Sequence, residues 1–106
     1  MTVAVHLSVK QGYEPLYEVL RRALDQAQSG KGHERHATDK PFLHQPILTI
    51  GRMVGTGYQL GQAMKKAQES TRLPTKERQV AELLGAINYL AAAILMIEEA
   101  PDAAGE

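Results

Sequence analysis

The chain has 106 residues, the size of a single domain that can bury a modest core. Twelve basic and twelve acidic side chains cancel, so overall charge gives no argument for nucleic-acid polymers or membranes as partners. Cysteine is absent, which excludes disulfides and thiolate metal sites and fits a reducing cytoplasm. We therefore expect one domain over residues 1–106, with no DNA, RNA or membrane partner.

The first thirteen residues carry a short alternation of apolar and polar side chains, with Val3, Val5, Leu7 and Val9 apolar. The run lacks the basic start and the cleavage pattern of a secretory signal. No second strand is visible for it to pair with. We expect residues 1–13 to form a loosely held arm.

A first helix is predicted from about Glu14 to Gln28, because Pro15 suits the first helical turn and Gly30 ends the pattern. Apolar side chains recur along one stripe of this helix at helical spacing. They are Leu16, Leu20, Ala23, Leu24 and Ala27.

The connector from Ser29 to Pro46 is long for a compact domain and dense in hydrogen-bonding side chains. Phe42, the only phenylalanine, is expected to anchor it to the core. Lys31 lies between two glycines and can bring an ammonium and backbone N–H groups to one phosphate. Arg35 adds a bidentate fork. The supporting donors are His36, Thr38 and Lys40.

The same connector has the spacing of a possible metal site, since His33 and His36 stand three residues apart. Glu34 or Asp39 would be a third ligand. Arg35 lies between the two imidazoles and would repel a cation. We therefore expect no metal and no cofactor.

A second helix is predicted from about Ile47 to Ser70, and it contains four glycines, Gly51, Gly55, Gly57 and Gly61. Each costs about 1 kcal/mol in a helix interior relative to alanine. Close approach of a neighbouring backbone, a kink, or room for a ligand would offset that cost. The pattern does not decide among the three.

A third helix is predicted from Pro74 or Thr75 to about Glu99, ending before Pro101, with a frayed tail over residues 99–106. From Leu83 to Ile97 it is apolar on nearly every side, which indicates burial on every side. This apolar segment is too short for a membrane span, and Gly85 and Asn88 within it make it too polar. Two further helices cannot enclose it, so we expect a homo-oligomer.

An enzyme is the first alternative. The run Ala81–Leu90 superficially resembles the acidic helix of MazG-type nucleotide pyrophosphohydrolases, which hold magnesium with several carboxylates. Gly85 and Ala86 stand where a metal-binding acid is wanted, and Glu69 alone lies near the end of the second helix. The sequence also shows no Ser-His-Asp or Cys-His arrangement that would activate a nucleophile. We expect no catalytic residues.

Several motifs fall in a characteristic order over about residues 14–98. They are the first helix, Gly30–Ala37, Pro41-Phe42, Gln45-Pro46-Ile47, Gly61-Gln62-Ala63, Lys65-Lys66 and Glu82–Leu90. This pattern resembles the anti-CBASS sponge family of phage proteins. CBASS is a bacterial defence in which cyclic oligonucleotides trigger a killing effector, and the sponge hides those messengers.

The resemblance implies an all-α protein, a short N-terminal helix with two long antiparallel helices, assembled as a hexamer in the cytoplasm of the infected host. It implies binding of cyclic dinucleotides between subunits, and of cyclic trinucleotides at separate sites, without cleavage. Tyr17 best matches the family's base-stacking aromatic residue and Lys31 its phosphate-binding lysine, with Tyr13 or Lys40 as substitutes. Direct contact with a host protein is the second alternative.

Overall fold

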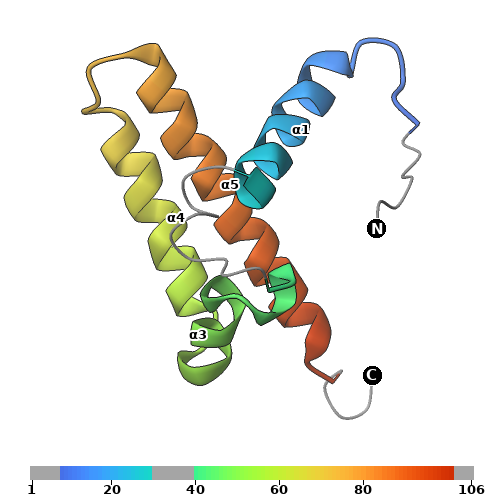
Figure 1. Cartoon of the computed structure of the whole chain (residues 1–106), viewed down its shortest axis with the longest axis vertical. Helices are drawn as coiled ribbons and strands as arrows, with labels where there is room; N and C mark the ends of the chain where they lie inside the picture. Colours follow the sequence, from blue (N-terminus) through green and yellow to red (C-terminus); the bar gives the residue numbers. More distant parts are fainter. Residues whose placement is uncertain (1–7, 30–39, 102–106) are drawn as a thin grey trace.

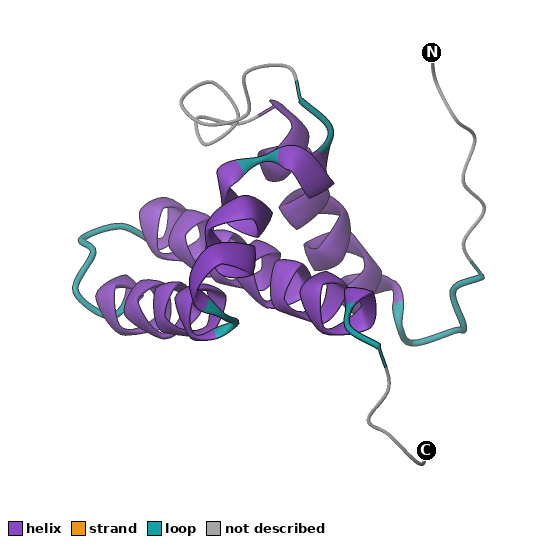
Figure 2. Cartoon of the chain, turned by 90° about the horizontal axis from the view of Figure 1, so that it is seen from below, coloured by secondary structure: helices purple, strands orange, loops and turns teal. Residues whose placement is uncertain are grey.

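The computed structural model describes residues 8–29 and 40–101, and all regular structure in these ranges is helical. In chain order the elements are α1 (Glu14–Ser29), the 3-10 helix η1 (Phe42–His44), α3 (Pro46–Val54), α4 (Gly57–Ser70) and α5 (Lys76–Glu99). The predicted all-α class is confirmed, and Figure 2 shows only helices and loops in the described ranges. Most of the predicted arm and tail lie outside these ranges.

The helices are arranged around α5 (Figure 1). α4 runs antiparallel to α5 and lies along it, joined by the short turn after Ser70. α1 crosses α5 on another side, while α3 packs against both α4 and α5 near the C-terminal end of α5. Each of the other α-helices therefore packs against α5.

Both ends of α5 follow the sequence signals. Thr75 has an extended backbone, and its Oγ1 accepts a hydrogen bond of 3.2 Å from the Arg78 backbone N–H, which is a standard N-cap. Ala100, just before Pro101, ends the helix in an extended conformation. The predicted limits of this helix are confirmed, as are those of the first helix to within about a residue.

The other helices of the chain leave part of the α5 surface uncovered. Its small residues bring neighbouring helices close, and a methyl group added at Gly85 would lie 3.2 Å from Lys66 Cδ of α4. Lys66 Nζ then reaches Glu82 of α5 at 2.9 Å. The buried residues of α5 are Leu84, Gly85, Ala86, Ala92 and Ala93. A single chain therefore does not enclose α5, as the sequence predicts, and coverage of the remaining face by other copies stays a prediction.

The prediction of one continuous second helix is wrong. α3 ends at Val54 and α4 begins at Gly57, with Gly55 between them at φ 100°. This left-handed backbone conformation is rarely adopted by residues other than glycine, so Gly55 is the residue that permits the break. The protein therefore has two shorter helices where one long helix was expected.

Gly51 explains how α3 and α4 pack after the break. The Gln59 side chain of α4 is fully buried, and its Nε2 donates to the Ile47 carbonyl of α3 at 3.0 Å. A methyl group at Gly51 would lie only 2.7 Å from Gln59 Cδ. Gly51 thus provides the space in which a buried amide can cap the backbone of the neighbouring helix.

The C-terminal end of α5 is held to α3 by an ion pair. Arg52 Nε donates to Glu99 Oε2 at 2.9 Å, and a second nitrogen of the same guanidinium reaches Oε1 at 2.6 Å. This hydrogen bonding lowers the pKa of Glu99 from its ordinary value of 4.5. The pair therefore favours the folded state only while Glu99 is ionised.

We expect Glu99→Gln to make the protein less sensitive to acid. A lowered folded-state pKa contributes stability that is complete above about pH 4.5 and is lost as pH falls through the lower folded value. Melting temperatures measured between pH 7 and 3 should fall less in Glu99→Gln than in the parent. The matched control is Glu98→Gln, because Glu98 forms no ion pair with a described residue. Equal acid sensitivity in the two variants would contradict the assignment.

Candidate functional site

A pocket of about 530 Å³ opens between α1, η1 and α5. This volume lies within the usual range of small-molecule sites, about 300–1,000 Å³. Apolar side chains form most of its wall, and amides and one lysine complete it. The lining residues are Leu20, Ala23, Leu24, Ala27, Gln28, Lys40, Phe42, Gln45, Ile87, Asn88 and Ala91.

Two amide side chains fix the helices that form the pocket. Asn88 of α5 donates through Nδ2 to the Ala23 carbonyl of α1 at 2.9 Å. Gln26 of α1 donates through Nε2 to the Ala81 carbonyl of α5 at 2.9 Å. These reciprocal bonds set where α1 crosses α5, and they satisfy polar groups along an otherwise apolar contact.

Phe42 and Gln45 position the third wall. Phe42 is half-buried and lines the pocket, so its predicted role as an anchor of the connector is confirmed. Gln45 Nε2 donates to the Lys40 carbonyl at 2.8 Å and so folds the end of the connector onto η1. This bond places Lys40 in the pocket wall.

The described residues on either side of the predicted phosphate-binding segment lie at this pocket. Gln28, two residues before the segment Gly30–Asp39, lines the pocket, and so does Lys40 immediately after it. Of the predicted site residues, Lys40 is thus placed at the pocket. The others in the segment lie outside the described residues, and their assignments stay predictions; they are Lys31, Arg35, His36 and Thr38.

Tyr17, the predicted stacking residue, is partly exposed on α1 and is not among the residues that line the pocket. It precedes Leu20 by three positions, which places both side chains on one face of the helix. The rise along the axis between them is about 4.5 Å. A ligand larger than the pocket would therefore have to extend by one helical turn to reach Tyr17.

Tyr58 of α4 and Tyr89 of α5 pack against each other between the two helices. The rings of Tyr58 and Tyr89 meet edge to face with centroids 5.9 Å apart, and Lys66 Nζ lies 5.9 Å from the centre of the Tyr89 ring. Burial, followed by the contact with Tyr89, raises the pKa of Tyr58 to about 12. These rings hold the helix pair together and do not line the pocket.

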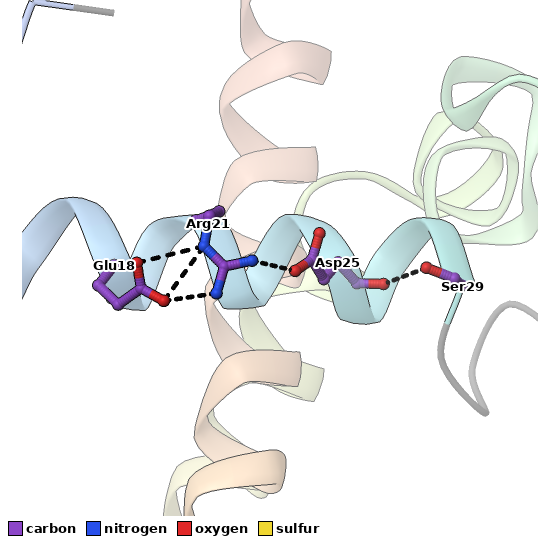
Figure 3. A network of polar contacts seen from close by, with 4 residues as sticks. All are labelled: Glu18, Arg21, Asp25 and Ser29. Atoms are coloured by element: carbon purple, nitrogen blue, oxygen red, sulfur yellow. Dashed lines mark hydrogen bonds and ion pairs between the residues drawn. The ribbon is translucent and has the colours of Figure 1, made fainter.

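The outer face of α1 carries a polar network (Figure 3). The Arg21 guanidinium bonds to Glu18 and to Asp25, and hydrogen bonding to Arg21 lowers the pKa of Glu18. Ser29 Oγ donates to the Asp25 carbonyl at 3.0 Å at the helix end. Arg21 is already paired with two carboxylates, so it is a poor candidate for an anion site.

α5 also presents a continuous apolar surface to solvent, which we call the α5 outer face. Its side chains alternate at spacings of three and four, the repeat by which helices pair side by side. Apart from the half-buried Ile87, its members are exposed. The α5 outer face consists of Val80, Leu83, Ile87, Leu90, Ile94 and Ile97.

Among the described residues, α5 is the one helix that could cross a membrane by length and composition, and 28% of its apolar 18-residue window is buried. The prediction that this helix is too short for a membrane span applies to Leu83–Ile97, whereas α5 is 24 residues long. Core helices of soluble proteins pass the same test. The absence of a membrane partner stays a prediction.

No family model, curated protein or solved structure matches the chain. Within the described ranges, no three His, Cys, Asp or Glu side chains are grouped as metal ligands would be. His33 and His36 lie outside those ranges, so the expectation of no metal stays a prediction.

Proposed function

We propose that the protein captures small cyclic oligonucleotides, cyclic dinucleotides first and cyclic trinucleotides possible at other sites, and holds them without cleavage. It would thereby blunt CBASS-type immunity in the cytoplasm of an infected bacterium. One observation carries the proposal: Gln28 and Lys40, which flank the donor-rich sequence 30–39, line the same pocket. That pocket combines apolar walls, suited to a base, with Lys40, suited to a phosphate.

A homo-oligomer, with a hexamer favoured by the resemblance, is the second part of the proposal. A single chain leaves the α5 outer face largely uncovered. Exposed apolar surfaces of this extent mark interaction sites more often than chance positions. Ile87 belongs to the α5 outer face and also lines the pocket, so a second copy on that face would lie beside the captured ligand.

The test is recovery of an intact ligand. Protein is mixed with cyclic di-AMP, the free ligand is measured in a filtrate, and the complex is then heated. Capture predicts depletion followed by return of unchanged cyclic di-AMP. Return of a cleaved product would overturn capture without cleavage. The pyrophosphohydrolase alternative instead predicts magnesium-dependent release of pyrophosphate from a deoxynucleoside triphosphate, which is measured in a separate assay. A filtrate that keeps its full ligand content would overturn the proposal and favour direct contact with a host protein.

We expect Lys40→Met to weaken capture by roughly tenfold to a hundredfold, because a charge-assisted hydrogen bond contributes about 1.5–3 kcal/mol. Titration calorimetry with cyclic di-AMP measures the change. The matched control is Lys65→Met, since Lys65 is exposed on α4 and does not line the pocket. Unchanged affinity in Lys40→Met would remove Lys40 from the site.

A further inference from the structure

The amides in the pocket wall present mainly acceptor atoms to a ligand. Asn88 Nδ2 donates to the Ala23 carbonyl at 2.9 Å, and Gln45 Nε2 donates to the Lys40 carbonyl at 2.8 Å. A carbonyl oxygen can only accept, so the orientation of each amide is fixed by chemistry. In both residues one of the two amide N–H groups serves the fold, which leaves the second N–H and the oxygen with its two lone pairs.

These two oxygens accept no hydrogen bond from a described residue. They stand among apolar walls that include Leu20, Leu24 and Phe42. A ligand that fills such a pocket must supply N–H donors, because a site built for a donor leaves its acceptors unpaired when the donor is missing. Apolar walls that include the Phe42 ring favour an aromatic ring as the group that carries these donors.

We infer that the pocket recognises an aminopurine base, with Asn88 Oδ1 and Gln45 Oε1 accepting from its exocyclic amine. The inference rests on the proposed function and adds to it a basis for choosing the ligand. Lys40, in the same wall, would lie toward the phosphate of that nucleotide. Bases without an amine would be bound less tightly.

The test changes the ligand and leaves the protein intact. Cyclic di-AMP is compared with the same ring in which both adenines are replaced by unsubstituted purine, which has no amine. We expect about a tenfold or greater loss of affinity in calorimetry, since each unmade bond to a half-buried acceptor costs about 1–3 kcal/mol. Equal affinities for the two rings would overturn the inference.

The position of the base is tested by filling the pocket. Ala27→Phe places a ring in the space that the base would take, and Ala67→Phe makes the same change at an exposed position of α4. We expect loss of cyclic di-AMP binding in the first variant alone, with an unchanged helical circular dichroism spectrum. If Ala27→Phe does not fold, Ala91→Phe fills the same pocket from α5. Tight binding in a folded pocket-filling variant would overturn the inference.

Adenosine and purine riboside separate this inference from the proposed function. Each is titrated into labelled protein, and amide shifts of the pocket residues are followed by NMR. Stronger shifts with adenosine support base recognition even if no cyclic ring is captured, in which case the proposed function alone fails. Capture of both rings with equal shifts from both nucleosides would leave the function standing and refute the base recognition.

Discussion

Gly51→Ala is expected to destabilise the protein by about 2–4 kcal/mol. The new methyl group would overlap the buried Gln59 side chain, and overpacking of this kind costs about 1–3 kcal/mol. Gln59 would also have to give up its hydrogen bond to the Ile47 carbonyl, which leaves a buried amide without a partner at a further cost of about 1–3 kcal/mol. Helix propensity opposes this by only about 1 kcal/mol.

The control for this variant is Gly61→Ala, because a methyl group at Gly61 would meet no atom within 4 Å. Only the higher helix propensity of alanine should then affect stability, so we expect Gly61→Ala to stabilise the protein by up to about 1 kcal/mol. Urea unfolding followed by circular dichroism measures both free energies of unfolding. The two variants should change the free energy of unfolding in opposite directions. A Gly51→Ala protein as stable as Gly61→Ala would refute the packing described for Gln59.

Leu90→Glu is expected to dissociate the proposed oligomer. Leu90 lies in the middle of the α5 outer face and is 45% exposed in one chain, so a charge there leaves the fold of the chain intact. In an interface, the change removes about 1.5–3 kcal/mol of apolar burial per copy and buries an unpaired carboxylate. The dissociation constant should rise by about a thousandfold or more.

Light scattering at micromolar concentration measures the effect, with circular dichroism as the test of folding. The matched control is Leu60→Glu on α4, where the side chain is 44% exposed. We expect the parent and Leu60→Glu to share one oligomer mass, and Leu90→Glu to have the mass of one chain. Dissociation by Leu60→Glu instead would move the interface to α4, and a monomeric parent would remove the oligomer altogether.

Local signals in the sequence were sufficient to predict where α5 begins and ends and where α1 begins. Thr75 and Pro101 bound α5, and Pro15 opens α1, because capping and proline effects depend on a few neighbouring residues. The break after Val54 could not be predicted, since the four glycines of this region look alike along the chain. Gly55 has a left-handed backbone and Gly51 faces a buried amide, whereas Gly57 and Gly61 meet nothing within 4 Å. Only tertiary packing separates these roles.

The candidate site was predictable in part. Phe42 and Lys40, which the composition of the connector singled out, both line the pocket, and a binding role for Lys40 stays a prediction. The role of Asn88 was missed, although a lone amide in an apolar helix was a signal that it serves a buried partner. Gln59 gave no such signal, because its partner carbonyl belongs to Ile47 and depends on the break at Gly55.

The hydrogen bonds between α1 and α5 join residues far apart in the chain, 65 positions for Asn88 and Ala23 and 55 for Gln26 and Ala81. The α4–α5 hairpin closes across a short turn, so it carries a much smaller loop-closure entropy and is expected to form first during folding. Docking of α1 then completes the pocket as a late event. Any molecule bound there would slow the undocking of α1, so occupancy would appear as slower amide exchange along that helix.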